Sequence, residues 1–298
     1  MTDNTRGILA ILASSGAFVL NDATIKLIAE KLPAGQTLFL RGVLASLILF
    51  VIMSWMGQRR PHREMLDPKM FLRALFAAGS AMFIVLSLQR LPLATVNAVL
   101  MATPLMVVAG SSVLFGEHIG IQRAIATLLG FAGVLLVLQP FGGGGAAGMA
   151  LAVVLIALAS TVTRDLITRA IPMKTPPLFI AYATSVLVML VALVFGIGET
   201  WQLPSLNTSM LLIFASFCVS AAYTFGVIAM RTGEISAVAP FRYFQIPGAV
   251  GIGYLLWGHI PNALAGVGIV MIAVAGLVLV IQERATARAV YDKAKKAI

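Results

Sequence analysis

Long apolar runs fill almost the whole chain, and short segments rich in Pro, Gly or charged residues separate them. Each run is about 20 residues long, the length that an α-helix needs to cross a bilayer. None has the ten-residue alternating pattern of an outer-membrane strand, and a helix satisfies its own backbone groups in lipid. We therefore expect an all-α membrane protein with ten spans, at about 7–30, 34–57, 69–90, 92–115, 120–139, 147–169, 176–196, 208–231, 235–257 and 262–282.

The composition agrees with a chain that has lipid as its solvent. It is 60% hydrophobic and 11% charged, with a mean hydropathy of +0.99, whereas soluble domains carry about 25% charged residues. A soluble fold of 298 residues could not bury this much apolar surface in one core. The single cysteine, Cys218, excludes a disulfide framework and a cysteine metal site.

The cationic side chains predict the orientation of the spans. A net charge of +10 can indicate nucleic-acid binding, but these charges gather in short loops between apolar runs. With the N-terminus inside, Lys31 and Arg90 fall in external loops, and Lys26, Arg41 and Arg242 fall within spans. All other Lys and Arg residues then lie at cytoplasmic positions, so we expect both termini in the cytoplasm of an inner-membrane protein that binds no nucleic acid.

The two halves of the chain match one another at a constant offset of 143 residues. The matched pairs include Asp22 with Asp165, Lys26 with Arg169, Pro33 with Pro176, Pro104 with Pro247 and Gln139 with Gln282. Each half holds five spans, an odd number, so the halves enter the membrane from opposite sides. This inverted repeat is typical of alternating-access transporters. It predicts repeats at 1–140 and 141–282, followed by a basic cytoplasmic tail, 283–298, near the anionic inner leaflet.

Short motifs along nearly the whole chain resemble one known superfamily. They are Asn21-Asp22-Ala23 to Lys26, Arg41, Leu93-Ala94 through Pro104, Phe115-Gly116-Glu117-His118, Pro240-Phe241-Arg242-Tyr243, Pro247 and Gly258-His259. Together they are similar to the drug/metabolite transporter superfamily, in its EamA-like group of ten-span members. Gly258-His259 departs from the family's usual Gly-Glu. The resemblance implies secondary transport of small metabolites, often amino-acid export, while some similar members take up nucleotide-like compounds such as S-adenosylmethionine.

Three charged residues in the first two spans form the first candidate site, because charges within a span are costly and therefore informative. Asp22 and Lys26 are four residues apart, so they share a helix face and can pair. Arg41 enters span 2 to a similar depth as Asp22 in span 1. This cluster either binds a zwitterionic substrate or a coupling proton, or is an ion pair that locks the two spans together.

A second candidate site lies in span 9. Arg242, beside Tyr243, has no acidic residue within five positions, and its fork suits a substrate carboxylate or phosphate. The alternative is an arginine that extends to the cytoplasmic interface. Pro104 and Pro247 fall near the centres of spans 4 and 9, where each is expected to kink its helix, either toward a cavity or for packing alone.

Four polar residues within spans are candidate hydrogen-bond partners for a ligand: Tyr223, Gln89, Asn97 and Gln245. Ordinary hydrogen bonds between helices are the competing interpretation for each of them.

Asp165 and Arg169 repeat the Asp22–Lys26 pattern in the second half of the chain. Their span runs inward, so we expect them near its cytoplasmic end as a loop ion pair. The charge pattern assigns Arg73 and Arg164 to cytoplasmic ends as well.

The function that these features favour is secondary transport of small polar metabolites, with amino-acid export first and uptake of S-adenosylmethionine or another nucleotide-like compound second. No span contains a histidine, since His62, His118 and His259 lie in loops, so an intramembrane enzyme is a minor alternative. A phosphate loop and a ring of like polar residues are missing, which argues against an ATP-driven pump and a channel. We expect no catalytic residue, cofactor or metal. Asp22 is the candidate for a coupling proton, and a monomer is compatible with the pattern.

Overall fold

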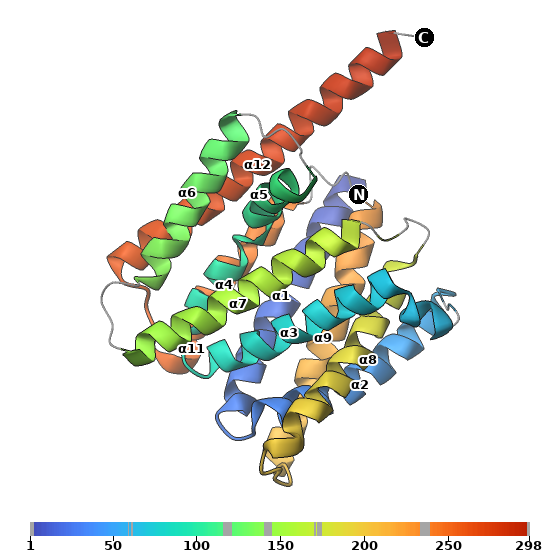
Figure 1. The fold of residues 1–298 in the computed structure, drawn as a ribbon, viewed down its shortest axis with the longest axis vertical. Helices are drawn as coiled ribbons and strands as arrows, with labels where there is room; N and C mark the ends of the chain where they lie inside the picture. The colour runs from blue at the N-terminus through green and yellow to red at the C-terminus, as the bar shows by residue number, and fades with distance from the viewer. Residues whose placement is uncertain are drawn as a thin grey trace.

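The computed structural model describes residues 3–58, 60, 62–115, 121–139, 145–169, 171, 175–232 and 239–296. Every regular element in these ranges is helical. The expectation of an all-α membrane protein is therefore confirmed (Figure 1).

The first half of the chain forms three long helices followed by shorter ones: α1 (Asp3–Ala29), α2 (Ala34–Trp55), the 3-10 turn η1 (His62–Leu66), α3 (Pro68–Leu88), α4 (Leu93–Leu100), α5 (Thr103–Phe115) and α6 (Ile121–Leu138). Asp67 sets the start of α3, because its carboxylate accepts hydrogen bonds from the backbone N–H of Lys69 and Met70 at 3.0 and 3.3 Å.

The second half follows the same order: α7 (Gly145–Arg169), α8 (Pro177–Phe195), η2 (Gly196–Gly198), α9 (Leu206–Thr232), η3 (Ala239–Phe244), α11 (Gln245–Trp257) and α12 (Ala263–Lys296). Pro177 lies in the first turn of α8, where its missing N–H is not needed. Gly258 ends α11 in the left-handed conformation, with φ of +68°.

Seven apolar segments within the described ranges are long enough to cross a membrane. They are Thr5–Ala29, Ala34–Trp55, Pro68–Leu88, Leu93–Gly110, Gly148–Thr168, Pro177–Gly198 and Leu206–Gly226. The apolar parts of α6 and α12, Ala124–Leu138 and Ala263–Val278, are shorter. A multi-pass membrane protein is thus established.

Spans 4 and 9 are each interrupted near the proline that was expected to kink the helix. A turn at Met101 and Ala102 separates α4 from α5, and Pro104 lies in the first turn of α5. Likewise η3 ends at Phe244, and Pro247 is the third residue of α11. Proline is tolerated in a first helical turn, so each chain segment starts a new helix instead of bending an old one.

The long helices pack in specific pairs. The most extensive contacts join α1 with α9, α3 with α7, α2 with α8 and α6 with α12 (Figure 1). In the last pair the backbones approach very closely, because a Cβ on Gly268 would lie 2.5 Å from the carbonyl oxygen of Gly133. The α12 helix continues past this contact to Lys296 and projects from the bundle (Figure 1).

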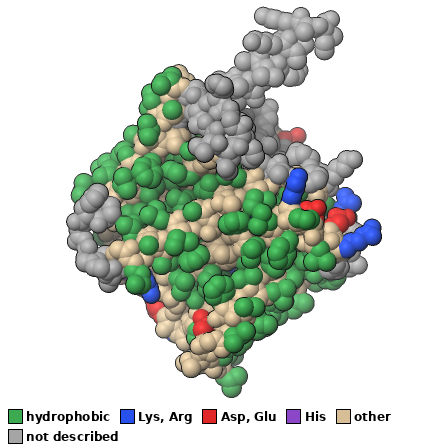
Figure 2. Space-filling view, viewed as in Figure 1, with side chains coloured by type: hydrophobic (Ala, Val, Ile, Leu, Met, Phe, Trp, Pro, Cys, Tyr) green, Lys and Arg blue, Asp and Glu red, His purple; other side chains and the backbone are tan. Residues whose placement is uncertain are grey.

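The outer surface is apolar, as lipid requires. Leu128, Val194 and Leu255 are 68, 65 and 79% exposed, and hydrophobic side chains dominate the face in Figure 2, with charged ones mostly at its upper right margin. Water could not solvate so large an apolar surface favourably. The helices therefore turn apolar side chains both to the core and to the bilayer.

Candidate substrate site

A first polar cluster, which we call the Asp22 cluster, forms where α1, α2, α4 and α11 meet. The Asn21 side chain donates to the Asp22 carboxylate at 3.0 Å, and Arg41 donates to the Asn21 amide oxygen at 3.3 Å. Asn97 lies within hydrogen-bonding reach of Asp22 and accepts from the Gln245 amide at 2.9 Å. The five side chains thus form two hydrogen-bonded groups, Asn21 with Asp22 and Arg41, and Asn97 with Gln245, which adjoin at Asp22 and Asn97.

The breaks in spans 4 and 9 position two members of this network. Asn97 lies in the last turn of α4, and Gln245 is the first residue of α11. Both are buried, at 0 and 8% exposed. Interrupted helices in transporters expose backbone and side-chain polar groups near the middle of the membrane, where substrates bind.

A second polar cluster, the Arg73 cluster, joins α3, α7 and α8. Arg73 donates through Nε to the Thr168 hydroxyl at 3.0 Å and through Nη1 to the Thr184 hydroxyl. Arg164 donates to the carboxylate of its neighbour Asp165 at 2.8 Å, and this ion pair is only partly exposed. The cluster thus holds two cations and one anion among half-buried side chains.

Tyr223 of α9 connects the two clusters. It lies near enough to interact electrostatically with Arg41, Arg73 and Arg164. Its ring packs edge-on against Phe18 of α1, with centroids 5.6 Å apart. Three arginines from three different helices therefore lie in the neighbourhood of this tyrosine.

The combined clusters carry an excess of positive charge. Arg41, Arg73 and Arg164 face only two carboxylates, those of Asp22 and Asp165, in the described part of this region. Guanidinium groups bind carboxylate and phosphate through paired N–H donors. The interior can consequently accept an anionic group and still offer carboxylates to a cationic one.

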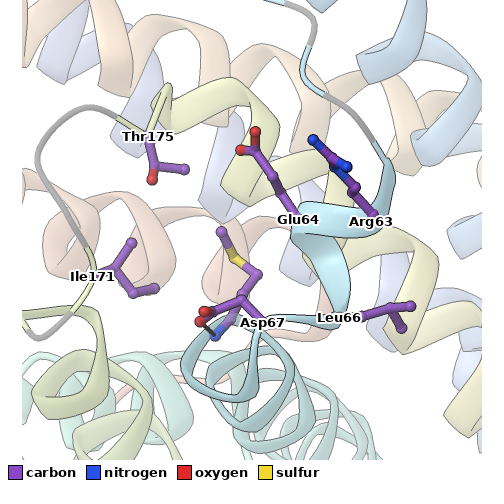
Figure 3. A pocket seen from close by; sticks show the side chains of 7 residues that line it. Arg63, Glu64, Leu66, Asp67, Ile171 and Thr175 are labelled. Atoms are coloured by element: carbon purple, nitrogen blue, oxygen red, sulfur yellow. Dashed lines mark hydrogen bonds between the residues drawn. The ribbon is translucent and has the colours of Figure 1, made fainter.

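A cavity of about 480 Å³ opens at one end of the bundle, beside η1 and the segment before α8. Figure 3 shows Ile171 and Thr175 on one side of it, with Glu64 and Asp67 on the other. Met70 also lines the cavity, and it precedes Arg73 by one helical turn of α3. This cavity is large enough to admit a small metabolite.

At the opposite end of the bundle, the loop between α8 and α9 is hydrogen-bonded to the start of α2. The Glu199 carboxylate accepts hydrogen bonds from the backbone N–H of Gly35 and Gln36, at 2.9 and 3.0 Å, in the first turn of α2. The Gln36 side chain in turn exchanges two hydrogen bonds with the backbone of Gln202. We call these contacts the Glu199 clamp.

Comparison with known proteins identifies the family. Residues 5–139 match the model of the EamA-like transporter family. Over 278 residues the chain is 28% identical to a pseudopaline exporter of Pseudomonas aeruginosa, a match that covers 91% of this chain and 94% of the relative. The chain is thus similar, over nearly its whole length, to EamA-like transporters of the drug/metabolite transporter superfamily.

Other relatives are transporters too. This EamA-like chain is 25% identical to a riboflavin transporter of Rhizobium johnstonii, over 71% of this chain and 69% of the relative. It is 22% identical to an S-adenosylmethionine uptake transporter of Rickettsia prowazekii, over 93% of each chain. A crystal structure with 18% identity superposes on 95% of this chain and 98% of its own, with a TM-score of 0.61, which supports the shared fold.

Two residues that the sequence placed in this EamA-like transporter's binding site lie elsewhere. The prediction that Asp22 and Lys26 form an ion pair is wrong. The Lys26 ammonium instead donates to the carbonyl oxygens of Leu88, the last residue of α3, and Leu91, at 2.5 and 2.8 Å. Gln89 donates to the Ala29 carbonyl at 3.1 Å. Both side chains therefore join the C-terminal end of α1 to the C-terminal end of α3.

The span 9 candidates also point away from the clusters. Arg242 is exposed on η3 and forms no ion pair with the described side chains. The Tyr243 ring packs onto α12, where only a glycine, Gly276, leaves room for its hydroxyl. Asp165 pairs with Arg164 inside the bundle rather than in a loop, and the Arg169 side chain is outside the described residues.

The sequence reasoning assigned Arg73 and Arg164 to cytoplasmic ends and thereby missed them as interior groups. Arg73 lies five residues into α3, and Arg164 lies five residues before the end of α7. A signal was available, because the 143-residue offset pairs Arg164-Asp165 with Asn21-Asp22. Because each arginine lies only five residues from the end of its helix, the sequence analysis placed both at the ends of their spans.

Proposed function

We propose that this EamA-like transporter moves small polar metabolites across the inner membrane by alternating access, with amino-acid export as its main activity. The observation that carries this proposal is the joined pair of polar clusters, with one end of the bundle open and the other clamped. Asp22, Arg41, Asn97, Gln245 and Tyr223 would bind or orient the substrate there. The chain would perform no catalysis and need no metal or other cofactor.

The helix pairing supports two inverted repeats at 1–140 and 141–282. With the 143-residue offset, α1 corresponds to α7 and α3 to α9, so the α1–α9 pair and the α3–α7 pair exchange places. The α2–α8 and α6–α12 pairs each map onto themselves. Ten spans with both termini cytoplasmic follow if each half contributes five.

Individual contacts repeat in the same way. The offset relates Phe18 to Thr161 and Ser80 to Tyr223. Phe18 packs on Tyr223, and the hydroxyls of Ser80 and Thr161 are 2.5 Å apart. Equivalent positions thus touch in both halves, although one contact is aromatic and the other a hydrogen bond.

A second pair of equivalent contacts lies in the clusters. The offset relates Arg41 to Thr184 and Arg73 to Ser216. Arg73 donates to Thr184, and Ser216 donates to the Arg41 backbone oxygen at 3.3 Å. Rocking one repeat against the other would break and remake such contacts, as alternating access requires.

The proposed orientation places the open cavity at the cytoplasmic end. The cavity lies beside the loop that joins α2 to α3, and that loop is on the same side as the N-terminus because α1 and α2 cross in opposite directions (Figure 1). The Glu199 clamp would then close the external end. The C-terminal part of α12 would carry the basic tail along the inner leaflet.

Uptake of S-adenosylmethionine or a similar compound is the second candidate. A relative named for that activity aligns over 93% of this chain. The Asp22 and Asp165 carboxylates would suit the cationic groups of such a substrate. The fold and the two clusters would be the same, and only direction and cavity shape would differ.

Proteoliposome uptake and counterflow would test the proposal, with a panel of amino acids and adenosyl compounds. The full chain would be compared with Asp22→Asn and with Arg90→Gln, a change at an exposed loop position. We expect movement of amino acids that Asp22→Asn lowers at least tenfold and Arg90→Gln leaves unchanged. Movement of adenosyl compounds alone would favour the second candidate, and no movement of any compound would reject both.

A further inference from the structure

Arg73 has an unusual environment for an arginine inside a membrane protein. Its printed hydrogen bonds go to two threonine hydroxyls, and no described carboxylate lies within ion-pair distance. Two of the five N–H donors of its guanidinium are thereby used. The remaining donors have no protein acceptor among the described residues.

The two hydroxyls orient the guanidinium without neutralising it. Thr168 donates its own proton to the Arg164 carbonyl oxygen, and Thr184 donates to the Ile180 carbonyl oxygen, each at 2.7 Å. Their lone pairs are therefore turned toward Arg73. Such a preset geometry fixes the direction of the free N–H donors before any ligand arrives.

The neighbouring charges favour an anion at this position. Arg164 lies close enough to repel Arg73, and the nearby Asp165 is already paired with Arg164. A half-buried cation that lacks a partner is costly in a low-dielectric interior. An added oxyanion would interact with both guanidinium groups.

The cavity at the open end lies close to Arg73 along α3. Met70 and Ile171 line the cavity of about 480 Å³. Met70 is one turn from Arg73 on α3, and the backbone N–H of Ile171 binds the carbonyl oxygen of Thr168, a residue that contacts Arg73. Two residues that line the cavity are thus sequence neighbours, by about one helical turn, of Arg73 and of its partner Thr168.

We propose that Arg73 binds an oxyanion of the transported metabolite, a carboxylate or a phosphate, with Arg164 as the second electrostatic contact. The proposal rests on the transport function proposed above and specifies its substrate class. Tyr223 borders the same space and would hydrogen-bond the bound group. The cationic end of a zwitterion would then lie toward Asp22.

The test uses the full chain in proteoliposomes and in detergent, as wild type, Arg73→Gln, Arg73→Lys and Arg90→Gln. Transport would be measured for transported amino acids, for the amines that lack their carboxylate and for phosphorylated metabolites. Stabilisation of the purified protein by amino acids and by inorganic phosphate would be measured in parallel as a shift in Tm. Arg73→Lys keeps the charge and controls for misfolding.

We expect wild type to prefer the carboxylated or phosphorylated compound over its neutral-ended analogue at least tenfold. Arg73→Gln should abolish that preference, Arg73→Lys should retain part of it, and Arg90→Gln should match wild type. A preference for phosphate compounds would identify phosphate as the oxyanion. Transport with an unchanged preference in Arg73→Gln would overturn this inference and leave the transport function intact. A wild-type protein that neither moves nor is stabilised by any oxyanion would overturn it too.

Discussion

Single side chains in this transporter separate into those that fasten helices and those that face the polar interior. Lys26 belongs to the first group, since its ammonium binds two backbone carbonyls and lies 5.5 Å from the Trp257 ring. Hydrogen bonds from charged groups contribute about 1.5–3 kcal/mol each. Lys26, which the sequence suggested as a substrate-binding residue, thus fastens α1 to the end of α3.

We predict that Lys26→Met lowers stability more than it changes transport. The loss of the bonds to Leu88 and Leu91 should reduce the Tm of the purified protein by several degrees, while the KM of any transported compound stays within about twofold. Thermal unfolding and transport kinetics on the same preparation provide the measurement. A large rise in KM without a change in Tm would return Lys26 to the substrate site.

Asp22 is the residue for which we predict coupling to protons. Its carboxylate accepts from Asn21 and lies near Arg41 and Asn97, within the helix bundle. Asp22→Asn preserves the shape and removes the titratable group, so transport should lose its response to an imposed pH gradient. The measurement is initial transport rate with and without the gradient, and Asp3→Asn, at the start of α1, is the control. A persisting response in Asp22→Asn would exclude this carboxylate.

The sequence was informative about these residues to different degrees. Asp22, Arg41, Asn97, Gln245 and Tyr223 stood out because polar groups within an apolar run are costly, and the structure brings them together. Lys26 was misassigned because spacing along one helix does not show which neighbouring helix a long side chain reaches.

At the scale of elements, the Glu199 clamp joins the first turn of α2 to the loop after α8. Such a cap satisfies helix N–H groups that otherwise lack partners and complements the positive end of the helix dipole. Removing a negative charge from a helix N-terminus costs about 0.3–1 kcal/mol, and the loss of one of the two hydrogen bonds adds about 0.5–1.5 kcal/mol. That amount is enough to change the population of a minor open state several-fold.

We predict that Glu199→Gln opens the clamped end more often. Thr37 is fully buried one residue beyond the clamp, so Thr37→Cys in a Cys218→Ala background reports access there. Its reaction with a membrane-impermeant thiol reagent from outside should be three- to tenfold faster with Glu199→Gln. Glu30→Gln is the matched control, because Glu30 is an exposed acidic residue with its own bond, from Trp257 at 3.1 Å. Equal rates in Glu199→Gln and Glu30→Gln would contradict a gating role.

Helix boundaries followed from the apolar runs to within a few residues, except that α12 continues from the expected end at 282 to Lys296. The breaks in spans 4 and 9 did not follow from the runs. The prolines were visible in the sequence, and proline at a helix centre usually predicts a kink. A proline within two residues of a new helix start is equally comfortable. Whether the helix kinks or a new helix begins depends on packing, here of Asn97 against Gln245, which the sequence alone does not show.

For the whole molecule, the helix pairs agree with the proposed inverted repeats, because the 143-residue offset exchanges the α1–α9 and α3–α7 pairs. The seven long spans agree with the apolar pattern. The offset could not foresee the unequal ends of the bundle, since identical repeats would make both ends alike. Glu199 corresponds to Met56 in the first half, a residue that cannot cap a helix.

We predict a topology in which both termini share the cytoplasm with the cavity. Single cysteines placed at Lys31 and Gly198 should react with an impermeant reagent in intact cells. Those placed at Arg60 and Asp67 should react only after the cells are permeabilised. All four would be made in the Cys218→Ala background. Labelling of Arg60→Cys in intact cells would reverse the orientation or change the number of spans.

The Glu199 clamp also affects how readily a released substrate can bind again from the end at which it left. When Glu199 leaves the α2 N-terminus, its negative charge is no longer compensated and stands at the rim of the newly opened end. A released anion would then meet repulsion as it diffuses back. For a substrate held by its oxyanion, the same carboxylate that joins α2 to the loop after α8 would disfavour rebinding from that end.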